Sequence, residues 1–271
     1  MKQTKLLRLV ETGLMLAVAT VLSMIKVLDL PYGGSITAAS ALPILLVAYR
    51  HGTLWGVFTG FAHALIQLLL GANTLSYATS PAAAVAIVVL DYLLAFTVLG
   101  LGGIFRHPRR QQSTALVTGA LLTGALRYTL HVIAGCTVWA GLSIPTQAAL
   151  LYSLAYNATY MLPETLVVML GAWYLSQAVD LGDTVLSRAK AVQTVSRPAF
   201  WVRVLAMTAL VIAAVWDIRE IFKPLQNPDT GDFVITNLSL VHWQTVGVVT
   251  AIGAAVWLGL ELLRRCLIRK D

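Results

Sequence analysis

Charged residues are scarce in this sequence. Asp, Glu, Lys and Arg make up 11% of its 271 residues, hydrophobic residues make up 58%, and the mean hydropathy is +0.78. A soluble domain carries about 25% charged residues, so this chain has too few polar side chains to cover a surface in water. The scarcity excludes an ordinary soluble domain and predicts a protein whose solvent is the lipid bilayer.

Cysteines and catalytic motifs are also few or missing. The two cysteines, Cys136 and Cys266, lie far apart, so we predict neither a disulfide framework nor a redox or metal site built on sulfur. The sequence has no GxxxxGK(S/T), HExxH or GxSxG motif, which excludes Walker-type ATP binding and leaves no signature of an enzyme. We therefore expect no catalytic residue, no cofactor and no metal.

Eight apolar segments are candidates for membrane spans, since a spanning helix needs about 20 residues. They are residues 6–28, 41–56, 57–72, 82–104, 114–138, 148–177, 199–220 and 243–264. A polar, basic stretch separates the sixth segment from the seventh. We therefore divide the chain into a six-span body (1–178), a basic cytoplasmic linker (179–197) and a two-span appendage (198–271) with an outer loop near 221–241.

The 19 Lys and Arg residues lie mostly on one side of this arrangement. They precede the first span, separate the second from the third, follow the fourth, surround the linker and close the chain. By the positive-inside rule, both termini are predicted to be cytoplasmic. The charge is spread over loops that flank the membrane and is not gathered into one patch, so we expect no nucleic-acid partner.

A few polar side chains interrupt the apolar segments. Asp91 stands alone in the middle of its span, where an unpaired charge costs about 2.5–3.5 kcal/mol even on the lenient insertion scale, so it needs a partner or a function. Arg127 and His131 are four residues apart and share one helix face, and Asn157 lies in the next span. With Tyr92 and other rings, such groups suit a flat, cationic, nitrogen-rich heteroaromatic ligand.

Each of these residues also has a purely structural interpretation. Asp91 and Arg127 are also consistent with a buried ion pair that fixes helix packing, although such pairs are weak stabilisers. Asn157 is typical of an interhelical hydrogen bond. Both alternatives stay open at this point.

Residues nearer the ends of spans have alternatives as well. Trp139 and Tyr152 are consistent with an aromatic belt at the membrane interface. Gly13 and Ala17 form a small-xxx-small pair, which indicates either ordinary helix packing or a docking face for another membrane protein.

Three stretches of the body resemble the thiamine-binding S component of energy-coupling factor (ECF) transporters. They are Leu90–Phe96, Leu126–Gly135 and Tyr152–Met161, and Pro31–Ser35 resembles that family's first loop. The resemblance covers about residues 5–178. It implies an all-α membrane protein with a six-helix S-component-like bundle, to which this chain adds two C-terminal transmembrane helices.

The resemblance also implies a function. The chain would be the high-affinity thiamine-binding subunit of an ATP-driven vitamin uptake transporter in a prokaryotic plasma membrane, and its partners would be thiamine, a membrane coupling subunit and two ATPase subunits. The substrate-binding residues implied are Asp91, Tyr92, His131, Trp139, Tyr152 and Asn157. Arg127 would orient a neighbouring residue, because a cation repels a cationic vitamin.

Two further roles follow from the resemblance. Tyr32, Gly33, Gly34 and Ser35 would form a mobile lid, and Gly13 and Ala17 would dock the coupling subunit. At the acidic position, where members of the family can have the longer Glu, this sequence has Asp91, which implies a slightly different reach to the ligand. No second tryptophan stands in the first loop.

Three other functions remain open from the sequence. An S component of the same fold would bind a thiamine precursor or another vitamin. An ion-coupled secondary carrier of an organic cation would use Asp91 and Arg127. A membrane enzyme acting on a lipid or isoprenoid head group is disfavoured by the missing carboxylate clusters.

Overall fold

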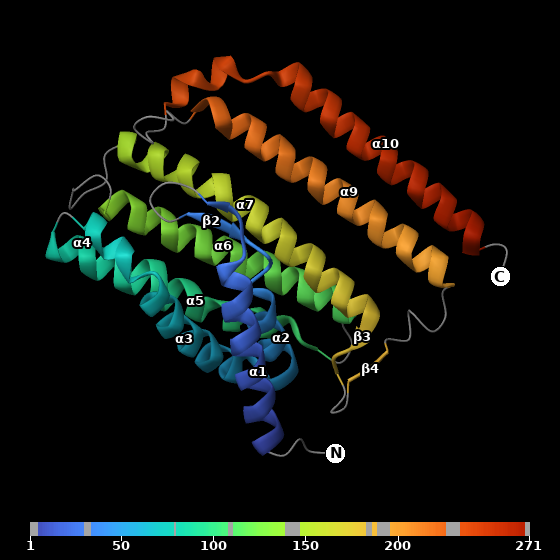
Figure 1. Cartoon of the computed structure of the whole chain (residues 1–271), viewed down its shortest axis with the longest axis horizontal. Helices are drawn as coiled ribbons and strands as arrows, with labels where there is room; N and C mark the ends of the chain where they lie inside the picture. The colour runs from blue at the N-terminus through green and yellow to red at the C-terminus, as the bar shows by residue number, and fades with distance from the viewer. Residues whose placement is uncertain are drawn as a thin grey trace.

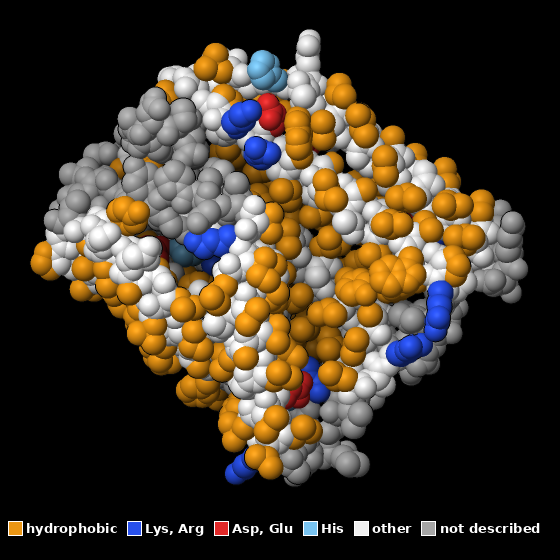
Figure 2. Space-filling view, in the orientation of Figure 1, with side chains coloured by type: hydrophobic (Ala, Val, Ile, Leu, Met, Phe, Trp, Pro, Cys, Tyr) orange, Lys and Arg blue, Asp and Glu red, His pale blue; other side chains and the backbone are white. Residues whose placement is uncertain are grey.

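The structure is a helical membrane-protein bundle with a separate helical hairpin along one side (Figure 1). The computed structural model describes residues 5–29, 34–78, 80–107, 111–138, 147–182, 186–188, 196–225 and 234–268. Hydrophobic side chains cover most of the face visible in Figure 2, and charged side chains are few and scattered there. This surface matches the all-α membrane fold predicted from composition.

The body comprises the helical segments up to residue 178. They are α1 (Lys5–Met24), α2 (Leu42–His51), α3 (Thr53–Leu70), η2 (Ala72–Tyr77), α4 (Pro81–Ala86), η3 (Ile87–Leu94), α5 (Ala95–Thr97), η4 (Val98–Phe105), α6 (Gln112–Val138) and α7 (Gln147–Ala178). The segments from α4 to η4 follow one another without a break, so residues 81–105 cross the bundle as one rod.

Within the described part of the chain, six helical rods are long and apolar enough to cross a membrane. They are Lys5–Met24, Thr53–Leu70, Pro81–Phe105, Gln112–Cys136, Arg197–Leu225 and Trp243–Ile268. Helix α7 has 32 residues and, at 1.5 Å per residue, is about 48 Å long, which exceeds the bilayer core. Helix α7 is not among these six because it carries more polar residues. These residues include Asn157 and Glu164, which are buried inside the bundle and do not face lipid.

The predicted boundary between the second and third spans is wrong. The chain turns at Gly52, whose φ of 98° lies in the left-handed region that glycine adopts without strain. Helix α2 therefore has only 10 residues, whereas α3 begins at Thr53. Arg50, His51 and Gly52 mark the break in the sequence and separate the two predicted spans, so only the bounds at residues 56 and 57 were drawn too late.

The end of the first span was also predicted too late. Helix α1 ends at Met24, and the following residues form strand β1 (Lys26–Asp29), which pairs antiparallel with β2 (Ser35–Thr37). A second short antiparallel pair, β3 (Val179–Asp180) with β4 (Ser187–Arg188), opens the linker. Strand β2 lies against α7 and places two of its residues, Ser35 and Thr37, at the site described below.

The body is held together by a core between α1, α2, η4, α6 and α7. Its fully buried members include Ile44, Leu45, Leu99 and Leu116. Glycines allow the helices to approach closely: a Cβ at Gly100 would clash with the backbone of α3 around Gly56. Helix packing in membranes depends on such small residues because lipid supplies no hydrophobic driving force.

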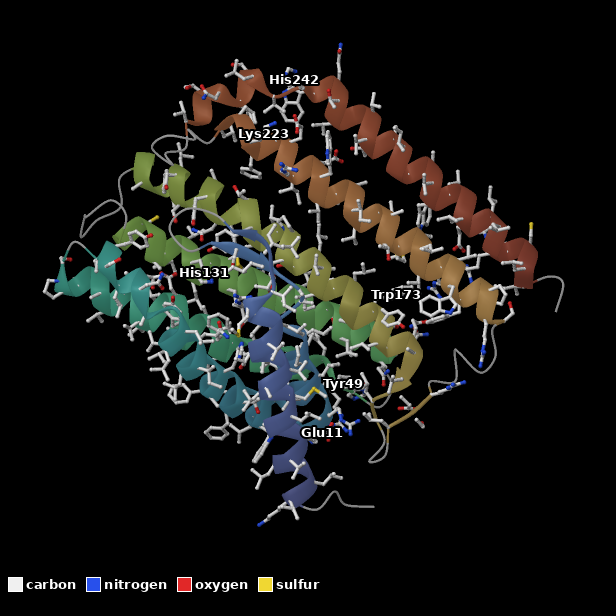
Figure 3. All side chains as sticks on the ribbon, in the orientation of Figure 1. Glu11, Tyr49, His131, Trp173, Lys223 and His242 are labelled. Carbon is white, nitrogen blue, oxygen red and sulfur yellow. The ribbon has the colours of Figure 1, made fainter. Side chains whose placement is uncertain are left out.

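The appendage is a hairpin of α9 (Arg197–Phe222) and α10 (Trp243–Ile268), joined through η5 (Lys223–Leu225) and η6 (Ile235–Leu240). Helix α9 packs along α7 and against α10 (Figure 1). Near the linker, Arg203 lies 5.3 Å from the ring centroid of Trp173. Figure 3 places Trp173, Glu11 and Tyr49 toward one end of the molecule, whereas His131 lies toward the end marked by Lys223 and His242.

Candidate functional site

A cavity of about 420 Å³ opens among α1, the β1–β2 pair, α3, η3, α6 and α7. Protein sites for small organic ligands have volumes of about 300–1,000 Å³. Its polar and aromatic lining comes from Lys26, Ser35, Thr37, Gln67, Thr74, Asp91, Tyr92, Phe96, Arg127, His131, Tyr156, Asn157, Tyr160 and Glu164. Four of the six predicted substrate-binding residues are in this lining.

Asp91 and His131 form the central polar contact of the cavity. Asp91 lies in the π-helical turns of η3, a distortion that is frequent at functional sites. Its Oδ1 is 2.8 Å from Nδ1 of His131, and the two side chains keep 24% and 11% of their surface exposed. The other imidazole nitrogen, Nε2, has no hydrogen-bond partner in the described part of the chain. Both residues line the cavity, and Asp91 is the more exposed of the two.

Asn157 joins α6 and α7 beside this pair. Its Nδ2 donates to the carbonyl oxygens of His131 (3.2 Å) and Ser153 (2.8 Å), and its Oδ1 accepts from the Tyr160 hydroxyl (2.6 Å). The predicted interhelical hydrogen bond is therefore present, and the same amide lines the cavity. Asp91 and Asn157 face one site and are linked through His131.

The aromatic residues predicted for the site fall into three groups. Tyr92 lines the cavity, and its hydroxyl donates to the Gly71 carbonyl at 2.9 Å. Tyr152 is not in the lining but stacks on Tyr156, with ring centroids 6.1 Å apart and planes 4° from parallel. Trp139 lies outside the described residues, so its role stays a prediction.

Arg127 lines the cavity without pairing with Asp91. Its guanidinium carbon lies 4.9 Å from the centroid of the Phe96 ring, and the residue is 9% exposed. Asp91 pairs with His131. The structural alternative of an Asp91–Arg127 ion pair is therefore not formed among the described residues. A cation over an aromatic face is attracted by the ring quadrupole, which accounts for how Arg127 is held.

The predicted site omitted a second carboxylate. Glu164 accepts hydrogen bonds from the backbone N–H and the hydroxyl of Thr37, both at 2.6 Å, and is 4% exposed. It thereby ties β2 to α7 at the edge of the cavity. Glu164 is a lone carboxylate within a membrane-length helix, which is the signal that identified Asp91. The same reasoning from the sequence would therefore have included Glu164 in the predicted site.

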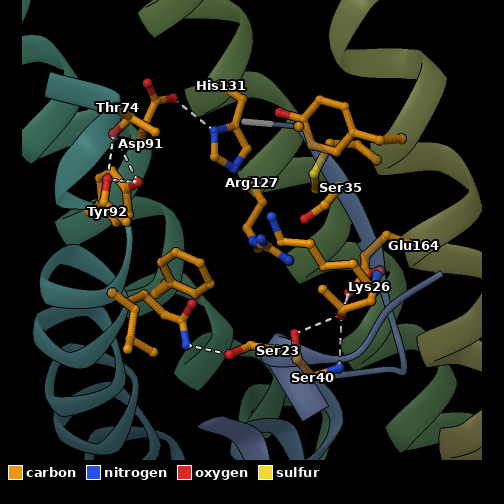
Figure 4. Close-up of a pocket in the computed structure, with 18 of the residues that line it drawn as sticks. Ser23, Lys26, Ser35, Ser40, Thr74, Asp91, Tyr92, Arg127, His131 and Glu164 are labelled. Atoms are coloured by element: carbon orange, nitrogen blue, oxygen red, sulfur yellow. Dashed lines mark hydrogen bonds and ion pairs between the residues drawn. The ribbon is translucent and has the colours of Figure 1, made fainter. Parts of the chain in front are cut away.

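The charges around the cavity are arranged unevenly. Figure 4 shows Asp91 and Tyr92 on one wall, Lys26 and Glu164 on the opposite wall, and Arg127 and His131 between them. The lining carries two carboxylates and two cationic side chains, so it is not negative throughout. Only the wall at Asp91 offers a carboxylate away from the Lys and Arg side chains.

The first loop and the first helix hold the remaining predicted residues. Tyr32 and Gly33 lie outside the described residues, whereas Gly34 and Ser35 line the cavity, and the Gly34 N–H donates to the Tyr156 hydroxyl at 3.0 Å. On α1, Gly13 and Ala17 are exposed, and no atom lies within 4 Å of the Cβ position of Gly13. This small-residue face is therefore not used to pack the helix within the body.

Comparisons with known proteins assign the body to a family. The family model described as "Thiamine transporter protein (Thia_YuaJ)" matches residues 9–180. Thiamine transporter ThiT of Bacillus subtilis (strain 168) is 32% identical over 179 residues, covering 62% of this chain and 89% of the relative. The counterpart from Lacticaseibacillus paracasei is 25% identical over 185 residues, covering 62% and 87%.

A solved structure agrees with these matches. The structure of ThiT from Listeria monocytogenes aligns with a TM-score of 0.51 and 25% sequence identity, covering 64% of this chain and 94% of that one. The family match ends at residue 180, so helices α9 and α10 lie outside it.

Proposed function

This chain belongs to the family of thiamine transporter proteins, and we therefore propose that its cavity binds thiamine for uptake across the cell membrane. The observation that supports this most strongly is the Asp91–His131 pair within a ring-lined cavity of about 420 Å³. Thiamine joins a permanently cationic thiazolium ring to an aminopyrimidine ring. The cavity offers a complement to each of these rings.

The cationic ring is assigned to the wall at Asp91. Its carboxylate keeps part of its surface open and bonds only His131 among the described side chains, whereas both oxygens of Glu164 already accept from Thr37. A carboxylate in a partly dry site balances an organic cation far better than water does. Tyr92 lies beside Asp91 and offers an aromatic face for a cation–π contact.

The aminopyrimidine ring is assigned to His131 and Asn157. The unpartnered Nε2 of His131 and the amide of Asn157 provide acceptors and donors along one edge. Tyr152 and Trp139 are proposed as further aromatic contacts, which requires Tyr152 to move from its stack on Tyr156. Arg127, held over Phe96, orients the wall and does not contact the cationic ring.

Calorimetry of the purified chain tests this assignment. We expect tight binding of thiamine and much weaker binding of neutral hydroxymethylpyrimidine, because only thiamine gains the contact with Asp91. Tighter binding of the neutral pyrimidine would show that the cation–carboxylate contact is not what the site recognises.

We further propose that uptake is powered by other subunits. The chain has no Walker motif, so a membrane coupling subunit and two ATPase subunits would supply the ATP-driven step. The exposed face of α1 at Gly13 and Ala17 suits close approach of another helix. Leucine at both positions should leave thiamine binding intact and abolish uptake in vesicles containing all subunits. Unchanged uptake would remove this face from the docking model.

A further inference from the structure

Among the described residues of the appendage, the end of α9 and η5 lie behind the wall of the cavity. We define the appendage turn as residues Phe222–Leu225. Leu225 is only 3% exposed, although it belongs to a hairpin whose other helix, α10, buries little beyond Gly253. Its side chain is buried in a cluster with Ile36 of β2 and Tyr156 of α7, and Phe222 packs against the same cluster.

The residues under the appendage turn belong to the cavity or adjoin it. Tyr156 and Tyr160 are members of this cluster and line the cavity as well. Ile36 stands between Ser35 and Thr37 on β2, and both of these neighbours line the cavity. Leu225 therefore lies one layer behind the wall, in one buried cluster with side chains of both segments that form this wall.

The wall is tightly fitted at this point. The Tyr156 hydroxyl accepts the Gly34 N–H at 3.0 Å, and a Cβ at Gly34 would overlap Tyr156 and Tyr160. A shift of the Tyr156 ring would therefore move the start of β2. Close-packed side chains transmit displacement in this way because they leave no void to absorb it.

The appendage turn is itself fixed from outside the body. The Leu225 carbonyl accepts the Val234 N–H at 2.8 Å, and the Pro224 carbonyl accepts from the Asn237 side chain at 3.2 Å. These bonds connect η5 to η6 and hold the backbone of the turn between the two appendage helices. The turn is thus tied by two hydrogen bonds to the segment that precedes α10.

We propose that the appendage turn is a positioning element for the cavity, in which Leu225 presses Tyr156 and Ile36 into place and so slows the departure of bound ligand. The ligand part of this inference depends on the proposed thiamine binding, whereas the effect on β2 does not. Leu225 touches no ligand and acts through Tyr156 and β2. The added hairpin thereby has a role in the family's site although it lies outside the family match.

The test compares Leu225→Ala with Leu240→Ala in the full chain. Leu240 belongs to the same appendage, undergoes the same side-chain truncation and is 59% exposed. In the ligand-free protein, hydrogen–deuterium exchange of residues 34–37 should speed up in Leu225→Ala and stay at the wild-type rate in Leu240→Ala. Exchange within α3 should not change in either variant. Equal acceleration throughout the body would mean global loosening and overturn the proposal.

The dissociation rate of radiolabelled thiamine provides the second measurement. We expect it to rise about tenfold in Leu225→Ala, since a deleted core side chain loosens what packs on it, and to stay unchanged in Leu240→Ala. Leu225→Met, which nearly conserves volume, should restore the slow rate. Where the Ala variant folds poorly, Leu225→Val tests the same contact with a smaller change.

The two measurements separate this inference from the proposed function. A wild-type chain that binds no thiamine would refute the proposed function, and the exchange experiment would still decide the role of Leu225. A wild-type chain that binds thiamine, with exchange and dissociation unchanged in Leu225→Ala, would overturn the inference alone.

Discussion

The body and the appendage use polar side chains in different ways. In the body, polar groups bond across helices far apart in the sequence: Trp55 donates to Thr12 and Gln67 donates to Ser23, each at 2.9 Å. In the appendage, the described polar link between α9 and α10 is a single bond from Thr250 to Asp217 at 2.6 Å. The body is therefore specified by an enclosed polar interior, and the appendage by its apolar surface and its contacts with α7.

The difference has a physical cause. An uncompensated polar group in hydrocarbon costs several kcal/mol, so a site rich in such groups needs helices on every side. The body supplies α1, α3, α6 and α7 around one cavity. A two-helix hairpin has no interior of this kind, so the appendage influences the site through the turn at Leu225.

The largest effect should come from removing the charge of Asp91. Asp91→Asn preserves shape but removes the counter-charge of a cation, a loss of about 3 kcal/mol or roughly a hundredfold in thiamine affinity. Binding of neutral hydroxymethylpyrimidine should change much less. Asp217→Asn makes the same change in the appendage and should leave the calorimetric affinity unaltered. An equal loss for both ligands would mean that Asp91 is structural.

The second largest effect should be on the free energy of unfolding, and it compares Glu164 of the body with Glu261 of the appendage. Glu164→Gln weakens two buried charge-assisted hydrogen bonds to Thr37, which is expected to lower the free energy of unfolding by about 1.5–3 kcal/mol. Glu261→Gln changes a pair with Arg264 on α10, which lies partly open at the surface, where ion pairs contribute at most about 1 kcal/mol. Thermal unfolding in detergent measures both.

A double variant tests the coupling between Glu164 and Thr37. Thr37→Val combined with Glu164→Gln should be less destabilising than the sum of the two single changes, because both remove the same contact. Full additivity would contradict a direct coupling between β2 and α7 through this carboxylate.

The smallest expected effect lies within the appendage. Thr250→Val removes the hydrogen bond to Asp217, and such bonds between membrane helices contribute about 0.6 kcal/mol on average. Unfolding should shift slightly, and thiamine affinity should stay at the wild-type value. A marked loss of affinity would mean that the two regions are coupled by more than the turn at Leu225.

Much of the site was predictable because charge inside an apolar segment is conspicuous. Asp91 was identified by its charge, and His131 and Asn157 as polar side chains within apolar segments; the three meet at one cavity. The helix spacing of four residues also placed Arg127 with His131. The predicted mobility of Tyr32–Ser35 and the stacking role of Trp139 remain predictions.

Other features left no local signal. The strand at Lys26–Asp29 follows α1 directly, and the first span was predicted to continue through it. The cluster that holds Ile36 and Leu225 joins residues almost 190 positions apart, and no periodicity of the sequence predicts such a cluster. Tertiary packing alone determines these features.

Mass spectrometry of the small molecule that co-purifies with the full chain tests the central claim most directly. The account predicts thiamine at one molecule per chain from the wild-type protein, and its loss from the Asp91→Asn variant. A neutral compound in its place, or no bound molecule after purification in excess thiamine, would contradict the claim that this cavity binds an organic cation through Asp91.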